Sequence, residues 1–260
     1  MEGKVAVVTG STTGIGLGIA RHLANLGCNV ILTGLGGATL IDGLVEEFTR
    51  KYAGKTYFVA CDLTKEDEIN TFCSNICSIF PEGIDILVNN AGIQFTASIE
   101  NYPLDTWNNM MAVGLTAPFL LIQEFLPKMK KKGWGRIVNM ASMMGIISGP
   151  ELAAYSACKS ALIGLTKGVA LEAARHGVTC NVVCPGYSDA PIFYHKIEKH
   201  AAANSLSFDC AKGELFSTLN PHKKPITVQE IAELVSFLCT SGADSMTCSP
   251  ILMDAGNTIK

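Results

Sequence analysis

Three side chains near the middle of the chain, Ser142, Tyr155 and Lys159, have the types and spacing needed for acid–base chemistry on an alcohol or a carbonyl. A tyrosine phenol titrates near ~10 and is a poor acid or base at neutral pH. In a helix, Lys159 would lie one turn beyond Tyr155 on the same face, and its ammonium would favour the phenolate and lower the phenol pKa. The pattern predicts that Tyr155 is a general acid or base and that Ser142 hydrogen-bonds to the reacting oxygen. A tyrosine–lysine pair alone is common on exposed helices, so the assignment depends on the surrounding motifs.

A glycine-rich turn near the start of the chain has the pattern of a phosphate-binding site. In TGSTTGIG, residues 9–16, three glycines stand where an apolar run changes into a helical pattern. Glycine allows the backbone to turn tightly and to approach a pyrophosphate, and a helix N-terminus offers free N–H groups. A purely structural turn is the alternative, but the position at a strand–helix junction favours nucleotide binding. The residues predicted to contact the phosphates are Gly10, Thr12, Thr13, Gly14, Ile15 and Gly16.

The residues after the second apolar run bear on the choice between NAD and NADP. An acidic residue there would bond the adenosine ribose, and an arginine would accept a 2′-phosphate, but TGLGG, residues 33–37, has neither. We predict NAD as the cofactor, with Leu35 packed against the adenosine. Asp62 and Leu63, at the end of the third apolar run, are placed for the adenine; the alternative is that Asp62 caps the next helix.

These residues need a scaffold that brings the ends of several strands together. Continuous apolar runs alternate with helical patterns, which is typical of a parallel sheet covered by helices on both faces. We predict a single α/β domain over residues 1–260, a doubly wound parallel sheet (Rossmann fold) with its ligands at the carboxyl ends of the strands. The polar stretch 187–225 breaks the alternation and is predicted to be a helical lid. The predicted strands are residues 4–10, 29–34, 55–63, 84–92, 135–142, 178–186 and 249–256.

Composition argues against several other classes of protein. With 48% hydrophobic and 17% charged residues the chain has the makeup of a globular protein, and a net charge of −3 argues against a nucleic-acid surface. We find no leader peptide and no apolar run of the ~20 residues that a membrane helix needs. The ten cysteines lack the spacing of a metal site and are predicted to be reduced thiols, which indicates a cytoplasmic protein without a metal.

The motifs also occur in the order found in one family. TGSTTGIG, NNAG, the serine before YSACK and the PG of CPG make the whole chain resemble the short-chain dehydrogenase/reductase family, and segments such as DILVNNAGIQ are similar to the bacterial D-3-hydroxybutyrate dehydrogenases. The resemblance implies a NAD-dependent oxidoreductase, usually a homotetramer, in which the tyrosine is the acid/base, the lysine also binds the nicotinamide ribose and the serine orients a small-molecule substrate. The further cofactor contacts that it implies are Asn90, Ala91, Gly92, Tyr155, Lys159, Pro185, Gly186 and Ser188.

Two positions near the predicted site depart from the family pattern. Gly114 stands where the family has an asparagine that holds a water in a proton relay to the lysine. Ala190 stands where a threonine usually bonds the nicotinamide amide, a role that Ser188 or the loop backbone would have to take over. We expect the relay to be impaired but not abolished, and Gly114→Asn to raise kcat.

The predicted substrate pocket also departs from the family pattern. Hydroxybutyrate dehydrogenases hold the substrate carboxylate with polar and charged side chains, and Gln94 matches that pattern, but Met144 replaces a histidine and Leu152 a lysine. The changes predict a pocket altered toward apolar contact, with Lys196 or His195 on the lid as the replacement charge. The predicted substrate residues are Gln94, Ser142, Met144, Leu152, Tyr155, Tyr187 and Lys196.

Two functions stay open at this point. The first is an active NAD-dependent dehydrogenase for a small hydroxy acid or for a more apolar secondary alcohol. The second is a NAD-binding protein of the same fold with impaired catalysis, kept for interaction or regulation. The intact Ser142, Tyr155 and Lys159 favour the first, whereas Gly114 and Ala190 favour the second.

Overall fold

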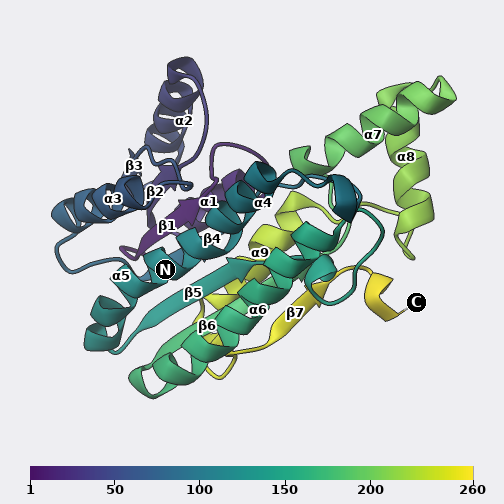
Figure 1. Cartoon of the computed structure of the whole chain (residues 1–260). Coiled ribbons are helices and arrows are strands. Elements are labelled where there is room, and N and C mark those ends of the chain that lie inside the picture. The colour runs from purple at the N-terminus through teal and green to yellow at the C-terminus, as the bar shows by residue number, and fades with distance from the viewer. Residues whose placement is uncertain (260) are drawn as a thin grey trace.

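The predicted doubly wound sheet is confirmed. In the computed structural model, which describes residues 1–259, all seven strands run parallel in the order β3-β2-β1-β4-β5-β6-β7 (Figure 1). The strands are β1 (Val5–Thr9), β2 (Asn29–Thr33), β3 (Thr56–Phe58), β4 (Ile86–Asn89), β5 (Gly135–Met140), β6 (Val178–Pro185) and β7 (Pro250–Met253). β1 pairs with β2 on one side and β4 on the other, so the chain reverses its direction across the sheet at this point. In such sheets ligands bind at the carboxyl ends of the strands beside that reversal.

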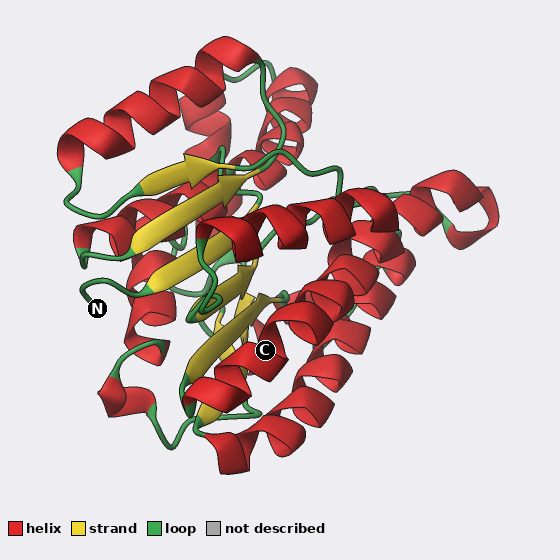
Figure 2. Ribbon diagram, turned by 90° about the vertical axis from the view of Figure 1, so that its left-hand side faces the viewer, coloured by secondary structure: helices red, strands yellow, loops and turns green. Residues whose placement is uncertain are grey.

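Helices cover both faces of the sheet, as Figure 2 shows. One face packs under α3, α5 and α6, with Phe72, Phe125 and Ala170 in its core. The other packs under α1, α2 and α9, with Phe48 and Ile231 in its core. Burial on both faces explains why the strands are continuously apolar. The helices are α1 (Gly14–Asn25), α2 (Ala38–Lys51), α3 (Glu66–Ile79), α4 (Leu104–Met111), α5 (Ala117–Lys132), α6 (Ala153–Ala173), α7 (Pro191–Asn204), α8 (Phe208–Leu219) and α9 (Val228–Leu238).

Two strands are shorter than the apolar runs that predicted them. β3 pairs with β2 only over Thr56–Phe58, because β2 ends at Thr33 and the residues after Val59 have no strand beside them. β4 ends at Asn89, because the N–H groups of the next two residues donate to the Thr9 hydroxyl instead of to a strand. After β3 the apolar Cys61 and Leu63 are buried in a loop, so apolar character there marks burial rather than strand.

The apolar pattern of residues 105–132 predicts one long helix, but in the structure this helix is interrupted. A π-helical turn at Ala112–Thr116, which contains the buried Gly114, separates α4 from α5. A π turn accommodates one extra residue in the helix and often occurs at functional sites. The combined run is long and apolar enough to cross a membrane, but its residues Leu121, Phe125 and Met129 are buried against the sheet, which is typical of a core helix.

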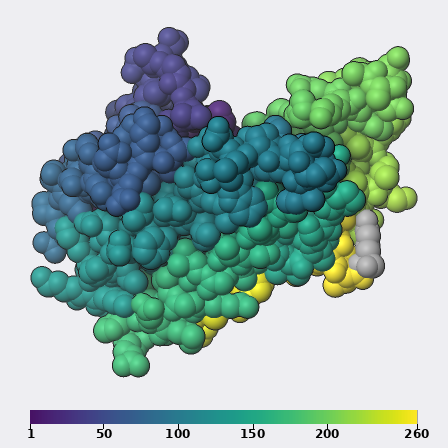
Figure 3. Space-filling view, viewed as in Figure 1, coloured from purple at the N-terminus to yellow at the C-terminus, as the bar shows by residue number. Residues whose placement is uncertain are grey.

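The stretch 187–225 forms a helical projection at one end of the carboxyl edge. Its two helices, α7 and α8, pack on each other through Phe193, Ile197 and Phe216 and extend from the body of the molecule (Figures 1 and 3). Between this green projection and the purple segment around α2, the upper outline of Figure 3 drops to a broad notch. The glycine turn and the predicted catalytic residues belong to the elements that end along this edge.

Candidate active site

The glycine turn is built so that a side chain at its third glycine cannot fit. A Cβ on Gly16 would lie 2.2 Å from the carbonyl oxygen of Gly10, while Gly10 and Gly14 have φ values of +63° and +54°. These are left-handed conformations that favour glycine. Thr13 precedes α1 without a side-chain capping bond, so the first N–H groups of this helix stay available to an anion. The turn therefore fits a dinucleotide pyrophosphate.

The adenosine side of the predicted cofactor site is neutral and open. Leu35 is 87% exposed just beyond β2, and its carbonyl accepts a hydrogen bond of 2.7 Å from the Thr12 hydroxyl. Thr12 was predicted as a phosphate contact, and the structure assigns its side chain to fixing the loop around Leu35. Asp62 accepts hydrogen bonds from the backbone N–H and hydroxyl of Thr64, which hold the pKa of this carboxyl below its usual range. Asp62 thereby stabilises the turn before α3 but does not cap this helix, because its N-cap is Lys65 and no side chain within residues 1–259 bonds to its first N–H groups.

A residue that sequence reasoning missed holds the NNAG loop in place. The hydroxyl of Thr9, the last residue of β1, accepts from the backbone N–H groups of Asn90 and Ala91, each at 2.9 Å. The Asn90 side chain in turn donates to the Thr9 carbonyl at 2.9 Å. A buried threonine at the end of an apolar run, directly before the first glycine, was the available signal. Through this loop a Cβ on Gly92 would lie 3.4 Å from Lys159 Nζ, so the cofactor loop and the catalytic helix meet.

Ser142, Tyr155 and Lys159 come together at the end of β5. Ser142 follows this strand and accepts a hydrogen bond from the Met144 N–H at 3.2 Å. Tyr155 and Lys159 lie on the buried face of α6, at 7% and 5% exposure. Lys159 Nζ donates to the carbonyl of Met140 at 2.9 Å and lies 5.7 Å from the centroid of the Tyr155 ring. The predicted pair is therefore real and buried, not an exposed helix pair.

The expected direction of the Tyr155 pKa is wrong for this structure. Burial raises the pKa of Tyr155 to about 12, and a hydrogen bond from Ser142 opposes that rise. Burial likewise lowers the pKa of Lys159. The sequence indicated that the two groups are neighbours but not that they are removed from water, and removal from water disfavours both charged forms.

An apolar wall stands beside Tyr155. Met144 and Cys158 share its buried cluster, and Leu152 and Tyr187 pack at the edge of it. Met144 and Leu152, which replace the family's histidine and lysine, therefore contact the catalytic cluster and are not surface variation. Sequence reasoning missed the rest of the wall, which comes from the helix before the π turn and the loop ahead of it: Tyr102, Trp107, Met110 and Met111.

The charged candidate on the projection faces this wall through an aromatic ring. Lys196 is an exposed residue overall, but its ammonium lies 5.2 Å from the ring centroid of Tyr187 and 5.7 Å from that of Phe193. Partial burial lowers the pKa of Lys196. Within residues 1–259 no carboxylate pairs with it. His195, the alternative, is near Glu198 instead, at 4.0 Å.

The remaining predicted residues lie on loops and at a helix end. Gln94 is exposed on the loop after β4, which is tied to the segment before α6 by a hydrogen bond from the Ala97 N–H to the Glu151 carbonyl. Ser188 is buried, and its hydroxyl donates to the Gly186 carbonyl at 3.0 Å. That hydroxyl is therefore engaged, and the loop backbone is the better replacement for the missing threonine. Ala190 is buried and begins α7 without a capping side chain.

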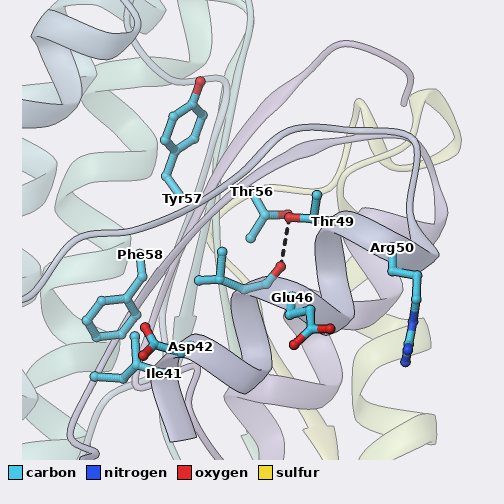
Figure 4. A pocket seen from close by; sticks show the side chains of 9 residues that line it. Ile41, Asp42, Glu46, Thr49, Arg50, Thr56, Tyr57 and Phe58 are labelled. Carbon is cyan, nitrogen blue, oxygen red and sulfur yellow. Dashed lines mark hydrogen bonds between the residues drawn. The ribbon is translucent and has the colours of Figure 1, made fainter. Parts of the chain in front are cut away.

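One hollow on the surface belongs to another part of the molecule. It has a volume of about 690 Å³ and lies between α2 and β3, where Ile41 and Phe58 form an apolar side (Figure 4). Asp42, Glu46 and Arg50 surround it along α2. None of the predicted cofactor or substrate residues lines this hollow.

With the site in view, comparison with known proteins decides the family. The model of the short chain dehydrogenase family matches residues 4–201. The chain belongs to this family. It is an oxidoreductase with a nicotinamide-cofactor fold, as the motif order had predicted.

The chain is also similar to individual members of this family. The chain is 41% identical to a D-beta-hydroxybutyrate dehydrogenase of Rhizobium meliloti over 98% of both chains. It is 39% identical to a D-beta-hydroxybutyrate dehydrogenase of Cupriavidus necator, again over 98% of both. Among solved structures, L-sorbose reductase from Gluconobacter frateurii, complexed with NADPH and L-sorbose, matches with a TM-score of 0.94 and 25% identity over 100% of this chain and 98% of that chain.

Proposed function

We propose that the protein is a NAD-dependent dehydrogenase that interconverts a hydroxy acid and the corresponding keto acid, with Tyr155 as the acid/base. The observation that carries the proposal is the buried cluster around Tyr155. There Lys159 and Ser142 stand beside the phenol, and the wall of Met144 and Leu152 ends at the cationic Lys196. The two hydroxybutyrate dehydrogenase relatives support the same class of substrate.

The choice of NAD rests on the loop after β2. A 2′-phosphate needs a cationic partner, and residues 34–37 offer only glycines and the exposed Leu35. The cradle at Gly16 fits the pyrophosphate that both cofactors share. The sorbose reductase structure contains NADPH, so the fold by itself does not select NAD, and we attribute the selection to this loop.

The proposed chemistry assigns one task to each catalytic side chain. The bound nicotinamide cofactor supplies the hydride acceptor for oxidation and the donor for reduction. Tyr155 Oη takes the alcohol proton during oxidation and returns it during reduction. Ser142 Oγ donates to the reacting oxygen and holds it against the phenol. Lys159, fixed by the Met140 carbonyl, stabilises the phenolate electrostatically.

The substrate is proposed to be an anion with an apolar chain. Met144 and Leu152 offer no hydrogen bond to a carboxylate. The Lys196 ammonium lies at the Tyr187 end of the same wall, and no carboxylate of residues 1–259 pairs with it. A carboxylate would gain a charge-assisted hydrogen bond there, worth ~1.5–3 kcal/mol. Closure of α7 and α8, the proposed lid, would bring Lys196 toward the substrate.

The direct test measures NADH formation with a panel of substrates at fixed pH. We expect turnover of 3-hydroxy acids, a much lower rate with neutral secondary alcohols, and at least tenfold weaker binding of NADP than of NAD. Tyr155→Phe should reduce turnover by about 10²–10⁴-fold with NAD affinity within about threefold of the parent. Turnover that persists in Tyr155→Phe would remove the assigned acid/base.

The second candidate function is a NAD-binding protein with impaired catalysis. Gly114 and Ala190 favour it, because each removes a side chain that the family uses near the reacting centre. The same panel decides between the two. NAD binding without turnover of any hydroxy acid or alcohol would establish the second.

A homotetramer in the cytoplasm completes the proposal. We place the interface on the helical residues 106–127 and 153–173. Phe119 on α5 is 45% exposed and Leu171 on α6 is 75% exposed, so the outer faces of both helices carry apolar side chains. All ten cysteines of the chain are unpaired within the described residues, which agrees with a reducing compartment. Light scattering coupled to size exclusion would give the mass of the assembly, and a monomer would contradict the proposed interface.

A further inference from the structure

Gly114 packs against a thiol from the catalytic helix. A Cβ built on Gly114 would lie 2.5 Å from Cys158 Sγ. Among residues 1–259, and apart from the two chain neighbours and the backbone of the same helix, no other atom lies within 4 Å of that Cβ. Real Cβ atoms do not approach another atom so closely. The position that the Cβ of a side chain at 114 would take is therefore blocked by the thiol of Cys158.

The same thiol is anchored to the helix before the π turn. Cys158 Sγ donates to the Met110 carbonyl at 3.6 Å, and Met110 lies one residue before the end of α4. Cys158 is 1% exposed, and burial raises its pKa, so the group is a neutral donor at neutral pH. It joins the catalytic helix α6 to the interrupted helix at the π turn.

Cys158 also has a fixed relation to the catalytic pair. It lies directly before Lys159 and three residues after Tyr155, and it shares the buried cluster of Tyr155. A shift of Cys158 away from a new side chain at 114 would rotate or displace this part of α6. Lys159 Nζ, held at 2.9 Å from the Met140 carbonyl, would move with it.

We propose that Cys158 is a positioning residue for Tyr155 and Lys159, and that its thiol takes the place of a side chain at position 114, so that the two positions work only in matched combinations. The glycine at position 114 then makes room for the Cys158 thiol, and its presence does not mean that catalysis has been lost. Its first consequence is that Gly114→Asn alone, which the family pattern suggested as an improvement, impairs the protein. The kinetic part of this inference rests on the proposed dehydrogenase function.

A double-mutant cycle tests the pairing. Gly114→Asn, Cys158→Ala and the double variant are compared in kcat, in the pH at which oxidation is half-maximal, and in the thermal unfolding of the ligand-free protein. Cys239→Ala combined with Gly114→Asn is the matched control, because Cys239 is equally buried but belongs to the core on the opposite face of the sheet. Cys158→Ser keeps a donor for the Met110 carbonyl in a smaller side chain. It therefore distinguishes the effect of losing this hydrogen bond from the effect of reducing side-chain volume.

For Gly114→Asn alone we expect overpacking to lower kcat about tenfold and Tm by several degrees. The midpoint of the pH profile should move to higher pH, because a displaced Lys159 stabilises the phenolate less. The double variant with Cys158→Ala should recover kcat to within about threefold of the parent and restore the pH midpoint, whereas the Cys239 control should not. Cys158→Ser alone should keep kcat within about threefold.

Either of two results overturns the inference. One is an increase in kcat for Gly114→Asn alone, and the other is additivity of the two substitutions within about 0.5 kcal/mol in the unfolding cycle. Because unfolding is measured without substrate, it tests the pairing even if no substrate is turned over. Absence of turnover in the parent protein would count against the proposed function alone.

Discussion

Burial of Tyr155 sets the pH dependence of the proposed reaction. Its pKa is raised to about 12 by burial, so the phenol is protonated at neutral pH and is ready to act as an acid. Reduction of the keto acid should therefore stay nearly constant between about pH 6 and about pH 9. Oxidation needs the phenolate, and its kcat/KM should rise about tenfold per pH unit over the same range.

Initial rates of oxidation and of reduction, measured with saturating cofactor across this pH range, check the predicted pH dependence. A pH-independent oxidation rate across that range would mean that the phenolate is already formed. Lys159 would then dominate over burial, as the sequence alone had suggested.

The proposed carboxylate contact predicts a charge-specific effect at Lys196. Lys196→Met should raise KM for a hydroxy acid about ten- to a hundredfold, which corresponds to the loss of one charge-assisted hydrogen bond. It should leave the KM of a neutral secondary alcohol within about threefold. Lys199→Met is the control, since Lys199 is an exposed lysine on the same helix. Equal effects of the two substitutions on the acid would show that Lys196 does not contact it.

At the level of single residues, motif spacing predicted which side chains lie close together. Ser142, Tyr155 and Lys159 lie together, and the methionine and leucine substitutions face the same cluster. What could not be predicted depends on distance across the fold. The steric relation between Gly114 and Cys158, which lie on different elements, has no signature in either local sequence.

The strand–turn–helix unit at the start of the chain can tolerate almost no added volume. Gly16→Ala would place a methyl group 2.2 Å from the Gly10 carbonyl and 2.4 Å from the Asn90 side chain. The backbone cannot yield there without moving β1 or the NNAG loop. We expect NAD affinity to fall at least tenfold, with Tm lower by several degrees.

The matched control is Gly43→Ala in α2, where a Cβ would meet no atom within 4 Å. This change should stabilise the helix by ~0.5–1 kcal/mol and leave NAD binding unaltered. Titration of tryptophan fluorescence with NAD measures the NAD affinity of both variants, and thermal unfolding measures their stability. Unchanged NAD affinity in Gly16→Ala would mean that the turn does not hold the pyrophosphate.

Element boundaries show where periodicity stops being informative. Hydrophobic patterns located all seven strands, and for residues 187–225 they indicated helical structure without placing α7 and α8 separately. They did not reveal the π turn at Ala112–Thr116, because one additional residue per turn barely alters the pattern over a long helix. They also overextended β3 and β4, whose lengths depend on where neighbouring strands end.

Across the whole molecule, the edge of the sheet opposite the site is held together by ionic contacts. Asp85 is 7% exposed, accepts from the Val5 N–H at 2.9 Å and pairs with Lys132 at 3.0 Å and with Lys4 at 3.5 Å. It thereby connects β1, α5 and the N-terminal segment. Asp85→Ala should destabilise the protein by ~2–3 kcal/mol, since it leaves a buried N–H and a lysine without their acceptor.

Thermal unfolding checks this value, at roughly 2–4 °C per kcal/mol for a chain near this size. The exposed Asp67 provides the control, because Asp67→Ala should change stability by no more than about 0.5 kcal/mol. The kinetic constants of folded Asp85→Ala should match those of the parent. Altered KM or kcat would show that the two edges of the sheet are coupled.

The two ends of the helical projection leave the body side by side. Ser188 and Ile226 form a parallel bridge, and the Asp189 N–H donates to the Ile226 carbonyl at 2.9 Å. Everything between them is thus an excursion that departs and returns at one point, and loop-closure entropy changes slowly with the length of such an excursion. We therefore predict that grafting the corresponding stretch of another family member between these two positions leaves the dinucleotide site intact and changes substrate preference, as kcat/KM for the donor's substrate would show.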